Sequence, residues 1–378
     1  MQKLYWRPAH ISRVVHTLVG VIAVAILLAA ERFQVVLVQP NFEEKLAAAQ
    51  LMRRGMDTIR VYRVRHVAPI DLSVDPTGSG MVGVANSSTT TNTGSLEAKR
   101  TTANPNWAAV AVDLLLEAGV QRGDLIAFGV SGSFPAMNLA AFAAAETLGL
   151  EVVSIAGVGA SSFGANFSQL TWLDMERILN DEKVISHRTI ASSLGGAKDR
   201  ALGITQAGRK RLRSAITRND ADYIDVTAEV SSIDLRMTHY ENAAQGRRYV
   251  TYVNVGGSLA SIGPKSVKRI YRPGLILKPD PRATDTDSVM MRFLRQGIPV
   301  VNLSKIASLA ESYGLPVEPE ELPQVGGGLV FEKREHNRPL LAGLLVFLLF
   351  TLYALLKLEL GARLTATGSR RRKLERMV

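Results

Sequence analysis

The sequence predicts an α/β protein with a mainly parallel sheet and helices on both faces, flanked by an N-terminal and a C-terminal transmembrane helix. Short apolar runs of strand length alternate with helix-like patterns through the middle of the chain, as in layered α/β folds. Three of these runs end in loops of Gly and Ser. Two longer apolar segments lie near the chain ends, which indicates a globular middle tethered at both sides.

The two terminal segments, residues 14–32 and 338–357, each have about the length of a membrane-spanning helix. A cleaved signal peptide is the alternative for the first, because it is N-terminal and follows basic residues. However, a cut after Ala30 would place Leu28 at a position that favours a small side chain. We therefore expect two transmembrane helices.

Charge predicts the orientation. The uncharged apolar runs within these segments are Val14–Ala30 and Leu340–Leu356; the chain before the first run carries +3 and the chain after the second carries +5, against +3 for the whole stretch between them. We expect residues 1–13 and the basic tail, residues 358–378, to be cytoplasmic and residues 33–337 to form an extracytoplasmic domain at the cell membrane. The basic residues then serve the membrane flanks and give no reason to expect nucleic-acid binding. The chain has no Cys, which excludes disulfides and thiolate chemistry.

The first part of the domain contains two expected helices and a long loop. Apolar residues recur at three- and four-residue steps over residues 42–65, which predicts an amphipathic helix. Residues 75–103 are rich in Gly, Ser and Thr, as in a flexible linker or a binding loop; loops this long inside a compact domain are often functional. Asn104 as N-cap and Pro105 as first residue predict a second helix, ending at Gly119.

Residues 125–138 are the centre of the expected fold. Leu125–Val130 has the length and apolar character of a buried strand, and Ser131-Gly-Ser follows as a tight turn. Pro135 suits the first turn of the next helix, with Ser133 as its N-cap. Such a strand–turn–helix directs backbone N–H groups toward one point, which attracts an anion or presents a serine nucleophile.

The second half repeats this alternation. Residues 157–166 are Gly- and Ser-rich, but the third Gly comes too late for a dinucleotide fingerprint. The expected helix at 206–217 carries a basic cluster, Arg209–Arg213, as a solvated face or a ligand contact. Further strands are expected at 151–156, 223–226, 249–255 and 298–303, and further helices at 171–181, 227–244, 286–296 and 305–313.

The Gly/Ser loops predict the site, because ligands of parallel sheets bind beyond the carboxyl ends of the strands. Loops 131–133, 157–164 and 256–261 would together present backbone donors and hydroxyls to an anionic or carbonyl ligand, unless they are three ordinary tight turns. The expected ligand-binding residues are Ser131, Gly132, Ser133, Lys99, Arg100, Gly159, Ser161, Ser162, Gly256, Gly257 and Ser258.

Several of these segments resemble the poly-γ-glutamate system protein family of bacterial membrane proteins. The resemblance covers most of the chain and rests on Thr89–Thr101, Asn104–Trp107, Gly129–Asn138, Gly159–Asn166 and Trp172–Glu176. It implies an accessory role in the synthesis or export of poly-γ-glutamate, with the anionic polymer and the synthase membrane subunits as partners. It implies no reaction and no catalytic residue.

Three functions remain open from the sequence. The first is a non-catalytic domain that binds the polymer, and the second is a structural subunit of the synthase complex. The third is a serine-dependent amide hydrolase or transferase, with Ser131 as nucleophile and either Asp234 and His239 or Lys99 as its partners. No cofactor is expected, and no metal-ligand spacing appears in the sequence.

Overall fold

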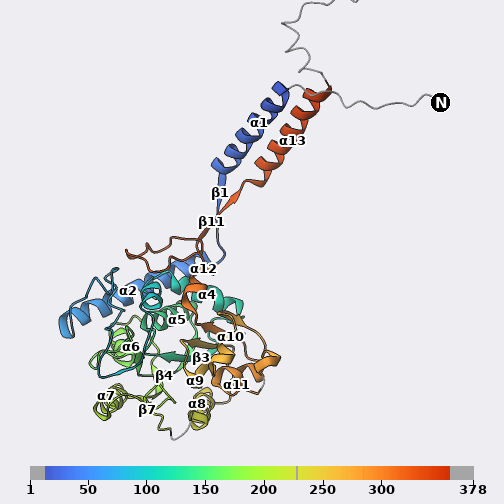
Figure 1. Ribbon diagram of the computed structural model, residues 1–378. Coiled ribbons are helices and arrows are strands. Elements are labelled where there is room, and N and C mark those ends of the chain that lie inside the picture. Colours follow the sequence, from blue (N-terminus) through green and yellow to red (C-terminus); the bar gives the residue numbers. More distant parts are fainter. Residues whose placement is uncertain (1–12, 227–228, 284, 358–378) are drawn as a thin grey trace, which may run out of the picture. The chain divides into compact units, whose positions relative to one another are not determined.

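The computed structural model describes residues 13–226, 229–283 and 285–357 (Figure 1). The chain divides into two compact units. Residues 38–332 form one, and the described residues of 1–37 and 333–378 form the other.

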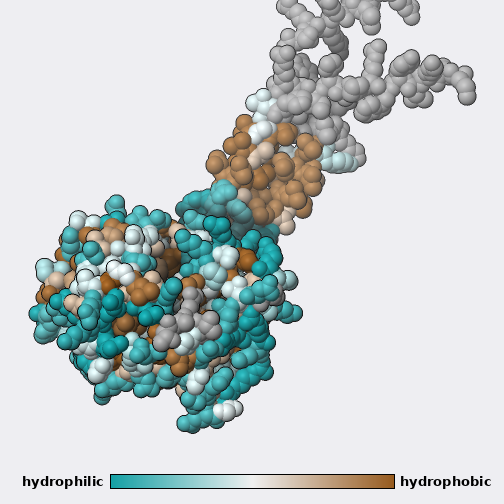
Figure 2. Space-filling model, turned by 60° about the horizontal axis from the view of Figure 1, so that its bottom comes forward, coloured by the Kyte–Doolittle hydropathy of each residue, from teal (hydrophilic) through white to brown (hydrophobic). Residues whose placement is uncertain are grey.

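The smaller unit is a pair of helices with a two-stranded sheet. Helices α1 (Arg13–Arg32) and α13 (Arg338–Lys357) lie side by side, and strand β1 (Gln34–Val38) pairs with β11 (Glu332–His336) (Figure 1). Large apolar side chains are exposed along both helices, including Val24, Leu28 and Phe350, and the pair has a largely apolar surface (Figure 2). Among the residues that the structure describes, no helix is both long and apolar enough to cross a membrane. The two predicted transmembrane helices are therefore not supported by the described helices.

The larger unit is built on a seven-stranded sheet in the order β7-β6-β4-β3-β8-β10-β9. Neighbouring strands are parallel except β9, which runs antiparallel to β10 at one edge. This confirms the predicted α/β class and the mainly parallel sheet. The strands are β3 (Leu125–Ser131), β4 (Glu151–Gly157), β6 (Thr189–Ser193), β7 (Asp222–Tyr223), β8 (Tyr252–Val255), β9 (Gly274–Ile276) and β10 (Val300–Leu303). A separate parallel pair is formed by β2 (Thr90–Asn92) and β5 (Ala160–Ser161).

Alternating side chains of the strands enter two different apolar cores, because successive strand residues point to opposite faces. Phe128 of β3 packs in the core that contains Trp107 and Trp172, whereas Ala127 packs in the core that contains Tyr240 and Phe293. The helices of this unit are α2 (Phe42–His66), α3 (Leu96–Thr102), α4 (Trp107–Glu117), α5 (Pro135–Leu148), α6 (Trp172–Asp181), α7 (Gln206–Thr217), α8 (Glu229–Ala244), α9 (Leu259–Ile262), α10 (Lys265–Ile270), α11 (Val289–Arg295) and α12 (Ile306–Ser312), with a 3-10 turn at Pro281–Ala283.

Two predicted N-caps are wrong, and one of the two helices also begins later than predicted. Helix α4 begins at Trp107, because Asn104 instead accepts a hydrogen bond from the Asn106 N–H at 2.9 Å in a turn before the helix. Helix α5 does begin at Pro135, but Phe134 holds the N-cap position. The side chain predicted to cap this helix, that of Ser133, instead accepts a hydrogen bond from the N–H of Ser161.

Candidate functional site

The carboxyl ends of the central strands surround one pocket of about 460 Å³. The chain leaves β3 toward β4, β6 and β7 on one side of the sheet, and later returns to β8 and β10 on the other side. Such a reversal of strand order opens a crevice where ligands bind in parallel sheets. The lining residues are Thr91, Asn92, Thr93, Gly94, Ser95, Lys99, Val130, Ser131, Ser133, Phe134, Gly157, Gly159, Ser161, Gly195, Gly196, Ala197, Gly257, Ser258, Leu259 and Lys268.

Seven of the predicted ligand-binding residues line this pocket. They come from the three expected strand ends and from the long loop, and they are Lys99, Ser131, Ser133, Gly159, Ser161, Gly257 and Ser258. Gly132, Ser162 and Gly256 stand next to lining residues, and their backbone N–H groups are used within the fold, by Gly157, Asn92 and Leu303 respectively. The small-residue corners therefore do lie together.

Sequence reasoning missed a fourth corner and a second lysine. Gly195, Gly196 and Ala197 follow β6, a strand that was not predicted, and Lys268 comes from the short helix α10. The sequence Ser-Ser-Leu-Gly-Gly at 192–196 had the same small-residue character as the other corners and could have revealed this one.

The turn after β3 is held by its own serines. The N–H of Ser133 donates to Ser131 Oγ at 3.0 Å, and Asn138 Nδ2 donates to the Ser131 carbonyl at 2.9 Å. Ser133 Oγ accepts a hydrogen bond from the N–H of Ser161 at 3.0 Å, which joins the first two corners. Ser131 and Ser133 are thus structural hydrogen-bond partners of the turn as well as parts of the pocket wall.

The Gly/Ser/Thr-rich stretch 75–103 is folded against the sheet ends. Strand β2 pairs with β5, so that Asn92 lies opposite Ser161. Asn166 fastens the preceding residues, since its side chain exchanges hydrogen bonds with the backbone of Val84 at 2.6 and 3.0 Å. The stretch ends in helix α3, whose N-cap is Ser95 and which carries Lys99. Of the two predictions for this stretch, its place in the pocket wall favours the binding loop.

Lys99 is the most unusual side chain in the pocket. It is only 3% exposed, its Nζ lies 3.1 Å from Ser161 Oγ, and it stands 3.5 Å from the centre of the Phe134 ring. No carboxylate forms an ion pair with it among the residues that the structure describes. Because burial penalises the charged form without such a partner, the pKa of Lys99 falls from 10.5 to about 7.

A second lysine, Lys268, also lines the pocket. Lys268 Nζ donates to the Gly257 carbonyl, and burial together with the neighbouring charge of Lys265 lowers the pKa of Lys268. Within the described lining there is neither Asp nor Glu. The pocket combines two amines, several hydroxyls and Gly-lined backbone, which suits a carboxylate or phosphate group.

Three other candidate residues lie outside the pocket lining. Arg100 donates to the carbonyls of Ser73 and Val74 at 2.7 and 3.0 Å, because the residues after α2 fold back against α3. Asp234 and His239 both lie on α8, where Asp234 pairs with Arg292 at 2.6 Å. The structure does not bring this acid and base to Ser131.

A buried polar cluster holds the loop at residues 195–201 in place. Arg236 of α8 is 2% exposed and pairs with Asp199 at 3.1 Å and with Ser193 Oγ at 2.7 Å. Ser193 Oγ in turn donates to Asp199 at 2.6 Å. The loop that supplies Gly195 and Gly196 is therefore fixed to the end of β6 and to α8.

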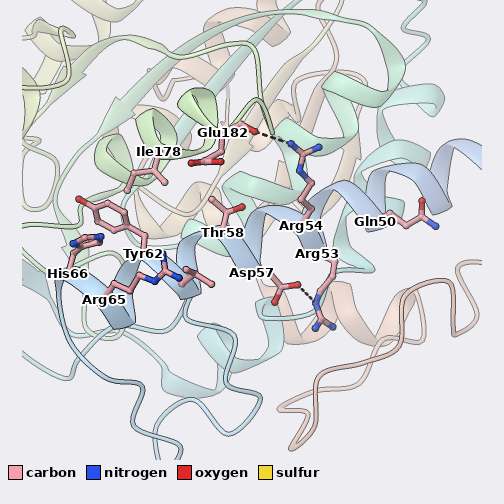
Figure 3. A pocket seen from close by; sticks show the side chains of 11 residues that line it. Gln50, Arg53, Arg54, Asp57, Thr58, Tyr62, Arg65, His66, Ile178 and Glu182 are labelled. Carbon is pink, nitrogen blue, oxygen red and sulfur yellow. Dashed lines mark hydrogen bonds and ion pairs between the residues drawn. The ribbon is translucent and has the colours of Figure 1, made fainter.

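A larger, shallow pocket of about 760 Å³ lies between α2 and α6 (Figure 3). Two of its arginines already have partners: Arg53 pairs with Asp57 at 2.9 Å, and Arg54 donates to the Glu182 carbonyl at 2.9 Å. No small-residue strand end reaches it. Volume alone is no reason to prefer it to the pocket at the strand ends.

The predicted basic helix, α7, borders a third hollow, of about 750 Å³. Arg209, Lys210 and Arg213 line it together with Leu194, which directly precedes the glycines of the main pocket. Arg213 also stacks on Tyr223, with 4.6 Å between the guanidinium carbon and the ring centre. The hollow and the main pocket are thus lined by residues that are adjacent in the sequence, Leu194 and Gly195.

Across residues 13–226, 229–283 and 285–357, no group of three or more His, Asp or Glu side chains is placed to hold a metal ion. No family model, curated protein or solved structure matches this chain.

Proposed function

We propose that this protein is a membrane-anchored accessory protein of bacterial poly-γ-glutamate synthesis or export, and that its α/β domain binds the polymer in the pocket at the strand ends. The observation that carries the proposal is the composition of that pocket. Two lysines, hydroxyls and glycine backbone face a space whose described lining has no acid. A chain of carboxylates is complementary to such a surface.

The context comes from the sequence resemblance to the poly-γ-glutamate system proteins. Three of the segments that carry it contribute lining residues to the pocket: Thr89–Thr101, Gly129–Asn138 and Gly159–Asn166. Asn166 also donates a hydrogen bond to the Val84 carbonyl. This agreement supports a shared ligand but does not identify it.

Anchoring is supported by the exposed apolar surface of α1 and α13. Side chains such as Leu27, Val346 and Phe347 are more than half exposed, an arrangement that lipid would favour and water would not. We propose that both helices are embedded in the cell membrane, with the basic chain ends on the cytoplasmic side and the α/β domain outside the cytoplasm. Protease added outside spheroplasts should then degrade residues 38–332, and full protection would refute this orientation.

The basic surface of α7 gives the polymer a path beyond the pocket. A flexible polyanion bound at Lys99 and Lys268 could continue past Leu194 to Lys210 and Arg213. Affinity should then increase with the number of glutamate residues and weaken at high salt, since exposed charges are screened.

The test is binding of fluorescent γ-glutamate oligomers to the full chain in detergent, followed by anisotropy. Lys268→Met should weaken binding at least tenfold, whereas Lys278→Met, an exposed lysine outside the pocket, should have no effect. Binding should also be tighter at pH 6 than at pH 8, because Lys99 is charged below its pKa of about 7. Equal affinity for both variants would refute the proposed site. Failure of the full chain to bind any oligomer, combined with co-purification of synthase subunits, would favour the structural role.

A further inference from the structure

We propose that Ser161 and Lys99 form a nucleophile–base pair that cleaves an amide bond of the bound anionic substrate. This deepens the proposed function, because it uses the same pocket, and it assigns the nucleophile to Ser161 instead of Ser131. Lys99 Nζ and Ser161 Oγ are 3.1 Å apart, within the reach required of a base and the group it deprotonates. No hydrogen bond connects Lys99 with Ser131 in the described part of the chain.

The surroundings of Lys99 favour the neutral amine that a base must be. Its side chain is 3% exposed and has no carboxylate partner among the described residues, so no negative charge offsets the cost of burying the ammonium. Burial brings the pKa of Lys99 to about 7, where neutral amine and ammonium are both populated at physiological pH. The face of the Phe134 ring, 3.5 Å away, stabilises the ammonium that proton transfer creates.

Ser161 is held in one position from both sides. Its N–H donates to Ser133 Oγ at 3.0 Å, and β5 fixes it against β2. Gly94 packs closely against the hydroxyl: a Cβ at that position would lie 2.7 Å from Ser161 Oγ, so a larger residue there would displace the serine. Ser161 lines the pocket although it is only 4% exposed, so its hydroxyl faces the pocket and is shielded from bulk water.

The chemistry balances with water as the second reactant. Neutral Lys99 takes the proton of Ser161 as Oγ attacks the amide carbonyl carbon, and the resulting ammonium gives that proton to the leaving nitrogen as the C–N bond breaks. The product is an ester of Ser161 and a free amine. Lys99 then takes a proton from water, whose oxygen attacks the ester, and the carboxylic acid leaves as Ser161 regains its proton. Lys268, which also lines the pocket, would bind a carboxylate of the substrate.

The absence of Cys from the chain allows a sharp test. Ser161→Cys introduces the sole thiol, whose reaction with iodoacetamide reports how readily the neighbouring base accepts its proton. In the full chain in detergent, alkylation at pH 7 should be at least tenfold faster for Ser161→Cys than for Ser161→Cys/Lys99→Met. The surface control Ser312→Cys should react at the same rate with or without Lys99→Met. Equal rates for the two Ser161→Cys proteins would overturn the proposal.

A second measurement uses the unmodified serine. A fluorophosphonate probe should form an adduct on Ser161, located by mass spectrometry, at a rate that rises with pH through about 7. Lys99→Met should slow it at least a hundredfold, and Ser312→Ala should leave it unchanged. No adduct on Ser161 between pH 6 and pH 9, in protein that still binds γ-glutamate oligomers, would reject the nucleophile and keep the binding function. An adduct in protein that binds no oligomer would keep the nucleophile and reject the proposed ligand.

Discussion

Replacing Lys99 with Met should stabilise the protein at pH 6 and destabilise it at pH 10. The pKa of Lys99 is about 7 in the folded protein against 10.5 for an ordinary lysine. Between these pH values the unfolded chain holds a proton that the folded chain has released, so the stability of the parent protein rises with pH. The difference corresponds to about 5 kcal/mol across the whole window. Met has no such dependence.

The opposing contribution is smaller. Met at position 99 loses the hydrogen bond to Ser161 and the contact with Phe134, together about 1–2 kcal/mol. The variant should therefore be more stable than its parent by about 3 kcal/mol at pH 6, and less stable by up to about 1 kcal/mol near pH 10, where about 0.8 kcal/mol of the parent's penalty remains. Urea unfolding of the full chain in detergent, followed by the fluorescence of buried Trp107 and Trp172, measures both.

A second buried lysine provides the matched control. Lys45 is 2% exposed, but it pairs with Asp113 at 2.8 Å and donates to the Val330 carbonyl at 3.1 Å. Lys45→Met leaves these partners unsatisfied and should destabilise the protein at every pH from 6 to 10. If Lys99→Met also changed stability by a constant amount over this range, Lys99 would not be an uncompensated buried amine, and the reasoning about its neutral form would fail.

Three further variants test other parts of the description. Glu176 is fully buried, and burial raises its pKa from 4.5 to about 7, so between these pH values the folded protein retains a proton that the unfolded chain releases and stability falls as pH rises. Glu176→Gln should remove this pH dependence and add about 2–3 kcal/mol of stability at pH 8. An unchanged pH dependence in urea unfolding would contradict this. Gly129→Ala should lower the free energy of unfolding by about 2–3 kcal/mol, because its Cβ would collide with the Tyr252 hydroxyl. Adding Tyr252→Phe should recover part of that stability. A single variant as stable as the parent would be inconsistent with the packing of β3 against β8. Gly257→Ala adds a Cβ 3.3 Å from the flexible end of Lys268, so the stability of the protein should stay within about 0.5 kcal/mol of the parent. The affinity for γ-glutamate oligomers should fall several-fold, because the lysine end must move. Unchanged anisotropy titrations would show that Lys268 does not contact the ligand.

The larger part of the fold follows from periodicity and turn chemistry. β3, β4 and α7 were predicted within one residue, since each is an unbroken apolar or amphipathic run with clear ends. Strand β6, Thr189–Ser193, was missed because only one of its residues is a large aliphatic one, and its two Ser residues are characteristic of loops. Its strand conformation depends on pairing with β4.

The site was predictable as a location but not as a set of contacts. Gly and Ser at the ends of parallel strands are a local signal, and the sheet brings such ends together. Lys99 and Ser161 are 62 residues apart, and their contact depends on the pairing of β2 with β5, two strands of three and two residues that no pattern indicated. The same holds for Arg236 and Asp199. Long-range pairs of this kind are determined by tertiary packing, on which a single sequence gives little information.

The Arg236–Asp199 cluster has a consequence for how a guest enters the pocket. Moving the loop that contains Gly195 and Gly196 would separate Asp199 from Arg236 and leave a buried charge unpaired, at a cost of several kcal/mol. This side of the pocket is therefore already ordered before a ligand binds, and ligand binding there requires no ordering of the loop. Ligand specificity at this wall then depends on shape, because a ligand group too wide for the space beside Gly195 and Gly196 is excluded.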